Sequence, residues 1–267
     1  MRKKIARFLG HKIPYFKGKD KIIRFLYSPN RNLNSGEIFT TEYFGKKYQG
    51  ETGNYIDWGV YFKGGIEKGL VNYIKTQINE FKYFLDVGAN SGTVSLPFCD
   101  ITKLKIICFE PLNYSYLKLI NNYKINNSFE KHSFHKIGLS NINQTSKIYF
   151  SDYDSNIGTA SLDEKQEKTF NKFEEIKLSR LDDIYNFKNE KIFIKIDIQG
   201  HEDKFLEGAI EMLKNNKILM YLETSNEKLL KKLQKMNYKV YFPKFLEGDY
   251  KFQKFKSNED VILKNFS

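Results

Sequence analysis

The chain is poor in cysteine and has no long uninterrupted apolar run. Its two cysteines, Cys99 and Cys108, do not form a CxxC pair, which argues against a disulfide scaffold and against a zinc site. This usage fits a reducing cytosol, so we expect a cytoplasmic protein. The basic start, MRKKIARFLGHKIPYFKGKDKIIRFLY, is interrupted by charges before a signal-peptide core or a membrane span could form. A peripheral contact with a membrane surface, as a short basic amphipathic helix, stays open beside a plain packed terminus.

Recognisable nucleic-acid modules, such as an RNP motif or a zinc finger, are also absent. The chain has 44 Lys and Arg against 32 Asp and Glu, a net charge of +12, which favours anionic partners such as nucleic acid, phosphates, nucleotide-linked metabolites or a membrane surface. The lysines are scattered with Asn and Ile along the whole chain, as on a solvated surface. We therefore expect nucleic acid not to be the partner.

The composition predicts a folded α/β protein. Apolar residues make up 40% of 267 residues, enough for one large domain with an added segment. The expected strands are YFLDVG, LKIICFEP, HSFHKIGLS, KIFIKID and ILMYLET. The segments SGTVSLPFCDI, NYSYLKLINNYKI and HEDKFLEGAIEMLKN separate them, with apolar residues three and four apart as in amphipathic helices. This βαβ succession predicts a mostly parallel sheet with helices on both faces.

The remaining segments decorate this sheet. NYKVYFP and EDVILKN are expected to close it as an antiparallel pair, and alternating strands over 146–162 and 173–184 predict a small inserted hairpin. Residues 1–80 lack clear βαβ units and are expected to form an N-terminal helical extension and lid, before a main domain over 81–267. In the extension, DWGVYFKGGIEKGLVNYI predicts an aromatic loop leading into a helix across the site.

The first strand turn, FLDVGANSG, has a carboxylate at the end of an apolar strand. Asp86 is followed by Gly88 and Gly92 around Asn90, and a helix is expected from about Ser91. Glycines let the backbone approach a ligand, and a helix N-terminus offers free N–H groups. The GxGxxG fingerprint of dinucleotide-binding proteins is missing, which weakens the dehydrogenase hypothesis.

The second strand also ends in an acid, Glu110, eighteen residues after Gly92. A carboxylate at this place accepts the hydroxyls of a ribose. With Asp86 facing an amino-acid part, the two acids suit a nucleoside with a cationic amino-acid tail. The pattern therefore predicts S-adenosylmethionine as cofactor.

The fourth strand ends in IKIDIQGHE, which places Asp197, His201 and Glu202 together. Ligands bind beyond the carboxyl ends of such strands, so these side chains are expected to face the transferable methyl group. Transfer to an alcohol benefits from a base. His201 is the first choice, because imidazole can be neutral near pH 7, while Asp197 could orient it, take the proton itself or hold the substrate. Glu202 is either catalytic or a helix-start acid.

A divalent metal ion is an alternative. Glu223 ends the fifth strand in YLETSN, next to the strand that ends in Asp197. Together with His201 these acids could ligate an ion that lowers the pKa of the acceptor hydroxyl.

These motifs, in this order over roughly residues 80–265, resemble the FkbM-type class I methyltransferases. The resemblance rests on FLDVGANSG, CFEPLNYSYLKLINN, SNIGTASL, LSRLDDI, IKIDIQGHEDKFLEGA and YLET. It implies a seven-stranded Rossmann-like sheet and O-methylation of a hydroxyl with S-adenosylmethionine as donor. Gln199 departs from the family pattern, which usually has an acid there.

The resemblance also assigns the cofactor site. The residues that would hold the methionine end are Asp86, Gly88, Asn90 and Gly92. Glu110 would hold the ribose, and Ser161 would close over the same pocket.

The leading hypothesis is an O-methyltransferase for a sugar hydroxyl. The sugar would be nucleotide-activated or glycan-linked, in the biosynthesis of a surface polysaccharide such as capsule or lipopolysaccharide. Tyr55, Trp58 and Tyr61 could line the acceptor side or form a lid over the cofactor. Two alternatives are a nucleic-acid methyltransferase, motivated by the charge, and a non-catalytic S-adenosylmethionine-binding module, motivated by Gln199. The acceptor and the oligomeric state are not predicted.

Overall fold

The computed structural model describes residues 1–32, 36–151, 155–163, 169–224, 226–246, 248–254 and 259–266. The helices are α1 (Arg2–Lys12), α2 (Lys19–Leu26), α3 (Tyr55–Lys63), α4 (Lys68–Gln77), α5 (Asn113–Lys124), α6 (Leu181–Ile184), α7 (Glu202–Glu207), α8 (Ile210–Asn215) and α9 (Glu227–Lys235). The 3-10 helices are η1 (Asn30–Asn32), η2 (Ile78–Glu80), η3 (Leu96–Phe98), η4 (Phe129–Lys131) and η5 (Ile157–Thr159).

The strands of the extension form a hairpin, and the others belong to a main sheet and a small sheet. They are β1 (Ile38–Tyr43), β2 (Lys46–Glu51), β3 (Tyr83–Val87), β4 (Lys105–Phe109), β5 (Ser133–His135), β6 (Gly138–Leu139), β7 (Gln144–Phe150), β8 (Lys172–Ser179), β9 (Lys191–Ile196), β10 (Lys217–Glu223), β11 (Lys239–Phe245), β12 (Tyr250–Gln253) and β13 (Asp260–Lys264).

The main sheet confirms the predicted Rossmann-like α/β fold. Its order is β12-β11-β13-β10-β9-β3-β4-β5, and the neighbours from β10 to β5 pair in parallel. The predicted antiparallel pair is present, since β13 pairs antiparallel with both β10 and β11. Within the described residues the sheet has eight strands and not the expected seven, because β12 adds to the outer edge of β11.

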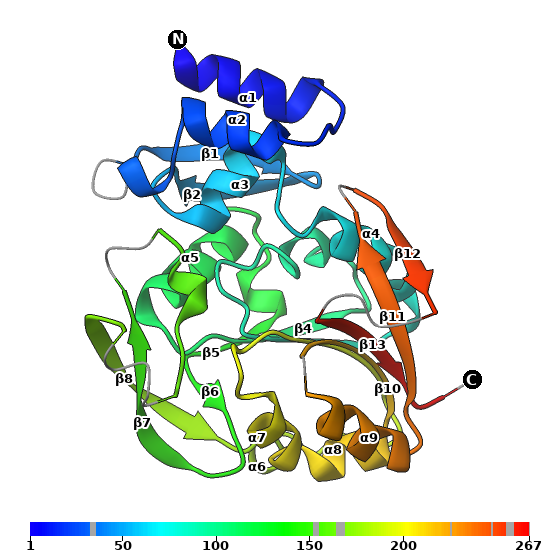
Figure 1. The fold of residues 1–267 in the computed structure, drawn as a ribbon. Coiled ribbons are helices and arrows are strands. Elements are labelled where there is room, and N and C mark those ends of the chain that lie inside the picture. Colours follow the sequence, from blue (N-terminus) through cyan, green and yellow to red (C-terminus); the bar gives the residue numbers. More distant parts are fainter. Residues whose placement is uncertain are drawn as a thin grey trace.

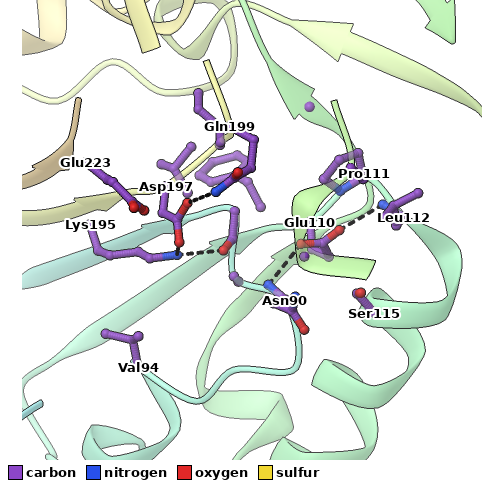
Figure 2. A pocket seen from close by; sticks show the side chains of 18 of the residues that line it. Asn90, Val94, Glu110, Pro111, Leu112, Ser115, Lys195, Asp197, Gln199 and Glu223 are labelled. Atoms are coloured by element: carbon purple, nitrogen blue, oxygen red, sulfur yellow. Dashed lines mark hydrogen bonds and ion pairs between the residues drawn. The ribbon is translucent and has the colours of Figure 1, made fainter. Parts of the chain in front are cut away.

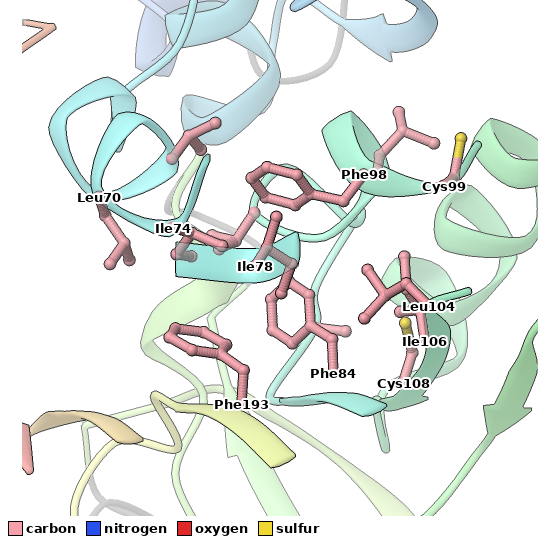
Figure 3. Packing of buried hydrophobic residues seen from close by; sticks show 14 of the residues in the cluster. Leu70, Ile74, Ile78, Phe84, Phe98, Cys99, Leu104, Ile106, Cys108 and Phe193 are labelled. Atoms are coloured by element: carbon pink, nitrogen blue, oxygen red, sulfur yellow. The ribbon is translucent and has the colours of Figure 1, made fainter. Parts of the chain in front are cut away.

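Helices cover both faces of this sheet (Figure 1). On one face, Leu70 and Ile74 of α4 and Ile78 of η2 pack toward Phe84 of β3 and Phe193 of β9 (Figure 3). On the other, apolar residues of α7, α8 and α9 pack under the same strands. Burial on both faces explains why these strands are continuous apolar runs.

The main sheet brings several strand ends to one edge. Asp86 of β3 pairs in register with Lys195 of β9, so these two strands end at the same level. Because β13 runs in the opposite direction, its first residue, Asp260, lies beside Glu223 at the end of β10. Four acids, Glu110, Asp197, Glu223 and Asp260, therefore lie at the edge where ligands of open α/β sheets bind.

The N-terminal extension lies over this edge (Figure 1), and its aromatic segment is not the predicted loop. Residues 55–63 form helix α3, because the side chain of Asn54 accepts hydrogen bonds from the N–H groups of Ile56 and Asp57. Trp58 is 1% exposed and stacks on Tyr55 inside a small core of α1, α2 and α3. The aromatics are therefore used in packing the extension.

The inserted hairpin is confirmed in the described residues. Strands β7 and β8 pair antiparallel, and β6 joins β8 as a third strand. Residues 152–154 and 164–168 of this insertion lie outside the described part.

The helix expected over 91–101 is wrong. Turns and the short η3 occupy this segment, with i to i−3 bonds such as that from the Phe98 N–H to the Ser95 carbonyl. Pro97 has no N–H to donate to the Thr93 carbonyl and interferes with the preceding turn, so an α-helix cannot pass through it. The free N–H groups of a helix start are consequently not available to a ligand here.

The single helix expected over 201–215 is broken into α7 and α8. Gly208 separates them, and a Cβ at this position would lie 1.9 Å from the carbonyl oxygen of Ser140. The close approach of the two backbones explains the break. Across the described residues, no helix combines the length and apolar character needed to cross a bilayer.

Candidate active site

A cavity of about 430 Å³ lies beyond the carboxyl ends of β3, β4, β9 and β10. Figure 2 shows Asn90, Glu110, Lys195, Asp197 and Glu223 converging around it from these strands. Its apolar wall includes Val87, Val94, Phe109, Leu112, Ile137, Leu139, Ile148, Leu162 and Ile198. An apolar wall with a few convergent polar groups is typical of a site for a small organic ligand.

The loop after β3 forms the floor of the cavity. Gly88 has φ +74°, and a Cβ there would lie 2.0 Å from the carbonyl oxygen of Asp197, so only glycine fits. All five N–H groups of residues 88 to 92 donate to protein acceptors: the Phe109 carbonyl (twice), the Glu110 carboxylate, the Asn90 side chain and the Ala89 carbonyl. A pyrophosphate would need such N–H groups to be free. The loop therefore suits a ligand without phosphates.

Glu110 lies at the end of β4 and lines the cavity as predicted. Its two carboxylate oxygens accept from the N–H groups of Asn90 and Leu112, each at 2.9 Å. Burial raises the pKa of Glu110 to about 7, although these hydrogen bonds favour the charged form. A ligand that brings hydroxyls or a positive charge would favour the ionised carboxylate.

Asp86 is placed one layer below the cavity. It is fully buried and does not line the wall. Its nearest charged partner is Lys195, whose Nζ lies 3.6 Å from Asp86 Oδ1 and donates to the Gly88 carbonyl at 2.7 Å. Burial would lower the pKa of Lys195, but Asp86, Asp197 and Glu67 outweigh it and raise that pKa. Asp86 thus acts on the cavity through a permanently charged lysine.

Asp197, Gln199 and Glu223 form the wall farthest from Glu110. Gln199 Nε2 donates to Asp197 Oδ1 at 2.9 Å, and Lys195 Nζ lies 3.8 Å from Asp197 Oδ2. Burial, followed by the charge of Asp197, raises the pKa of Glu223 to about 8. Asp260 adds a further acid beside them, hydrogen-bonded by the Tyr221 hydroxyl at 2.6 Å. Burial and the neighbouring acid thus favour the protonated form of Glu223.

His201 lines the cavity, but it is not joined to Asp197. Its Nε2 is 3.0 Å from the Ser140 hydroxyl, and burial lowers its pKa. The side chain of Asp197 instead contacts Gln199, Lys195 and Glu223. Of the three roles open to Asp197, the orientation of His201 is the one that these contacts do not support.

Glu202 lies in the first turn of α7, which fits the second of its two predicted roles, that of a helix-start acid. Its Oε1 accepts from the Gly200 N–H at 2.9 Å at the beginning of α7, and it is absent from the cofactor-sized cavity. Acids in the first turn interact favourably with the free N–H groups and the helix dipole.

The predicted metal ligands do not come together. The described residues contain no group of three or more His, Cys, Asp and Glu side chains placed to hold one ion. Asp197 and Glu223 are neighbours, but His201 turns to Ser140. The trio of Asp197, Glu223 and His201 is therefore not a metal site in this structure.

Two other predicted residues support the cavity without lining it. Gly92, with φ +86°, packs under the loop, where a Cβ would lie 2.9 Å from Leu119. Ser161 pairs with Tyr149 of β7 and accepts a hydrogen bond from the Asp163 N–H. The neighbours of Ser161, Ala160 and Leu162, do line the cavity, so the segment closes over it as expected while the Ser161 side chain does not.

The extension contributes residues that the sequence did not single out. Ile56, Ile66 and Glu67 line the cavity from α3 and the start of α4. Burial raises the pKa of Glu67 to about 7, and the Thr93 hydroxyl donates to it at 3.4 Å. No motif marks Glu67. Asp260 could have been found, because an antiparallel strand begins where its parallel neighbours end.

A second cavity of about 300 Å³ lies on the other side of the Asp197 wall. It shares Asp197, Gln199 and Glu223 with the first. Its other lining residues are Gly200, Glu202, Asp203, Thr224, Asn226, Leu229 and Glu259. All but two of these seven carry polar side chains, so this cavity suits a hydroxyl-rich molecule.

Known proteins resemble the chain in family and fold. A family model described as the methyltransferase FkbM domain matches residues 86–240. No curated protein matches by sequence. The tRNA methyltransferase TrmK of B. subtilis is 9% identical with a TM-score of 0.44, over 74% of this chain and 65% of that one.

Two further solved structures show similar values. A protein in the NADB-Rossmann superfamily from Streptococcus agalactiae is 13% identical with a TM-score of 0.43, over 73% of this chain and 67% of that chain. TYW2 of P. horikoshii, in complex with MeSAdo, is 12% identical with a TM-score of 0.42, over 85% and 70%. None of the three scores reaches 0.5.

Proposed function

The chain belongs to the FkbM methyltransferase family, and from this premise we propose that it methylates a hydroxyl group of a sugar with S-adenosylmethionine as donor. The sugar is nucleotide-activated or glycan-linked, and the product serves the assembly of a surface polysaccharide such as capsule or lipopolysaccharide. We place the reaction in the cytoplasm, in keeping with the two free thiols Cys99 and Cys108.

One observation carries this proposal: two cavities of different character share the wall of Asp197, Gln199 and Glu223. The first combines an apolar wall with acids, and the second is lined mainly by carboxyl and amide groups. Carboxylates and amides are acceptors for hydroxyl donors. A sugar in the second cavity would present a hydroxyl to the shared wall.

The residues of the first cavity fit the cofactor. Gly88 lets the loop after β3 pack against the Asp197 carbonyl and line the cavity, and the loop N–H groups are already satisfied. Glu110 is placed to accept the ribose hydroxyls, and Glu67 and Asp197 offer negative charge to the cationic amino-acid end. When bound, S-adenosylmethionine supplies an electrophilic methyl group on a positively charged sulfur.

The shared wall would handle the proton of the acceptor. Asp197 and Glu223 reach both cavities, so one of their oxygens can accept the hydroxyl proton while the new C–O bond forms. Lys195 stays charged and holds Asp197 in position from below. Gln199, at the place where the family usually has an acid, donates to Asp197 and keeps it oriented without adding a charge.

His201 lines only the first cavity. Its Nε2 is directed at Ser140, so we assign it a place beside the donor methyl group and give the proton to the Asp197 and Glu223 pair. The sequence alone favours His201 as the base. We prefer Asp197 and Glu223 because they line both cavities, whereas His201 lines one.

The test is turnover on a panel of acceptors. Purified protein is incubated with S-adenosylmethionine and nucleotide-sugars, lipid-linked sugars, free glycans or RNA, with and without a chelator. S-adenosylhomocysteine and product mass are followed, and NMR locates the methyl group. We expect an O-methyl sugar, with no loss on chelation, because no three ligating side chains meet among the residues that the structure describes.

Other results would redirect the proposal. Methylated RNA without methylated sugar would favour the nucleic-acid alternative. Tight cofactor binding without turnover on any acceptor would favour a non-catalytic binding module. In that case Gln199→Glu would test whether the acid that the family usually has at this position brings back turnover.

A further inference from the structure

Exposed apolar side chains gather in the first two helices. Among the described residues, fifteen large hydrophobic side chains are exposed, and seven of them fall within residues 1–25. These seven, which we call the N-terminal apolar surface, are Met1, Ile5, Phe8, Tyr15, Phe16, Ile22 and Phe25. Phe25 is 75%, Tyr15 64% and Phe8 57% exposed. Seven such side chains within 25 residues exceed the single exposed apolar residues that are ordinary on a protein surface.

The net charge gathers in the same place. Residues 1–32 contain ten Lys and Arg and one Asp, a net charge of +9 out of +12 for the whole chain. The lysines are scattered through the sequence, but the acids that balance them elsewhere are missing here. Lys4, Lys12, Lys17 and Lys21 are exposed and have no carboxylate partner among the described residues.

Helix α1 has exposed apolar side chains on the side that faces away from α3. Ala6 and Gly10 are buried, and a Cβ on Gly10 would lie 1.6 Å from the Phe62 carbonyl oxygen, so α1 rests directly on α3. Ile5 and Phe8, three residues apart, share the other side. Figure 1 shows α1 at the outer end of the molecule, away from the main sheet.

The two helices are fixed on the extension. Lys19 of α2 donates to the carbonyl oxygens of Gly10 and Ile13 at 3.1 and 2.7 Å, which satisfies the end of α1. Lys63 of α3 pairs with Asp20 of α2. The exposed side chains are thus displayed by a packed scaffold, and changing them should leave the fold intact.

We propose that the N-terminal apolar surface, with its surrounding lysines, docks the protein on an anionic phospholipid bilayer. Aliphatic and aromatic side chains enter the boundary between headgroups and acyl chains, and lysines bind the anionic headgroups. Nucleic acid would account for the lysines but not for exposed Ile5 and Ile22. A second copy of the chain would bring nine further positive charges against the same surface.

The experiment measures binding of the full chain to vesicles of phosphatidylcholine with increasing phosphatidylglycerol, by cosedimentation. Binding should grow with the anionic fraction and fall on going from 0.05 to 0.5 M salt. Replacing Lys4, Lys12, Lys17 and Lys21 by Gln should lower the partition coefficient by roughly 600-fold, taking about fivefold per lysine. Phe8→Ser and Phe25→Ser should each lower it by roughly tenfold.

Matched controls lie elsewhere on the surface. Leu117→Ser and Phe252→Ser each remove an exposed apolar side chain outside the N-terminal apolar surface. A fourfold Gln variant removes as much positive charge as the N-terminal one, by replacing Lys188, Lys228, Lys231 and Lys235. These variants should bind as the unaltered protein does. The assay needs no methyl acceptor, so its failure is separate from a failure of the proposed function.

Three results would overturn the proposal. The first is no binding to vesicles rich in phosphatidylglycerol at low salt. The second is binding that the N-terminal variants and the controls weaken alike. The third is release of the protein from vesicles by RNA at a lower concentration than free lipid needs, which would assign the surface to nucleic acid. A dimer in solution that Phe8→Ser dissociates would likewise contradict the proposal, because it would assign the surface to a second copy.

Discussion

The carboxyl pair of Asp197 and Glu223 makes a residue-scale prediction about the pH dependence of turnover. The pKa of Glu223 is raised to about 8 by burial and by Asp197. If the pair is the base, it becomes a stronger acceptor as Glu223 ionises. The rate at saturating substrates should therefore rise through about pH 8, and Glu223→Gln should lower kcat by roughly 100-fold, within the usual range for general-base catalysis, and remove the inflection.

A different base would give a different profile. Burial lowers the pKa of His201 below 6.5, so a His201 base would place the inflection below that value. An inflection below 6.5 that disappears in His201→Ala would contradict the assignment. Glu227→Gln, an exposed acid at the start of α9, is the matched control and should leave the profile unchanged.

At this scale the sequence predicted residues but not their orientation. Gly88, Asn90, Glu110, Asp197 and Glu223 all line the cavity, because strand ends and turns fix their position along the chain. The direction of a side chain depends on its neighbours. Asp86 lies below the cavity because Lys195, from the adjacent strand, takes the place beside the Gly88 carbonyl.

Among the structural elements, the loop after β3 depends on the absence of a Cβ atom at Gly88. In Gly88→Ala the new Cβ would overlap the Asp197 carbonyl oxygen at 2.0 Å and meet a φ of +74°. We expect a loss of about 2–4 kcal/mol in the free energy of unfolding, from overpacking together with left-handed strain. Urea denaturation measures the loss, and S-adenosylhomocysteine binding should weaken as the loop shifts.

Gly45→Ala is the matched control for this loop. Gly45 has a similar φ of +75° with nothing within 4 Å of the added Cβ. It should cost only the strain of about 1–2 kcal/mol and leave ligand binding unchanged. An equal loss in both variants would mean that the close approach at Gly88 does not matter.

The elements show where periodicity is informative and where it fails. Strands β3, β4, β9 and β10 and helix α5 follow their apolar patterns closely, whereas the single strand expected over 132–140 divides into β5 of the main sheet and β6 of the small sheet. The expected helix over 91–101 has the right apolar spacing but contains Pro97. Helix α3 corresponds to the aromatic segment that is predicted as a loop. Two signals favour the helix: Asn54 is a good N-cap residue, and Gly64 follows the last residue of the helix.

The whole molecule should lose stability as the pH rises. Burial raises the pKa of Glu67 and Glu110 to about 7 and of Glu223 to about 8, from 4.5 in each case. Each carboxyl binds its proton more tightly in the folded chain than in the unfolded chain. Their contribution is therefore full below pH 4.5 and lost as the pH rises through about 7 to 8.

Urea unfolding without ligand between pH 5 and pH 9 measures this effect. The free energy of unfolding should fall over that range, and saturating S-adenosylmethionine should restore more of it at pH 8 than at pH 6, because a cation favours the ionised acids. Stability that is flat or rises toward pH 8 would show that these acids are not buried as described.

On the scale of the molecule, the sequence predicted the mostly parallel sheet. The lid role of residues 1–80 stays a prediction, and no motif indicated which of these residues would reach the cavity. Glu67 enters the cavity from the lid, with no local pattern to mark it. Its position follows from packing of α4 on the main sheet, a contact between segments far apart in the chain. Such contacts are not encoded in a short motif.

Calorimetric titration of S-adenosylmethionine into the protein tests the central claim, that the cavity at the ends of β3, β4, β9 and β10 binds this cofactor. Glu110→Gln should weaken binding by roughly 10- to 100-fold, in keeping with the loss of charged hydrogen bonds to a ligand. Glu174→Gln is the control, since Glu174 also accepts a backbone hydrogen bond, from Asn113, but lies outside the cavity. Binding that is absent in the unaltered protein, or equally strong in Glu110→Gln, would contradict the account.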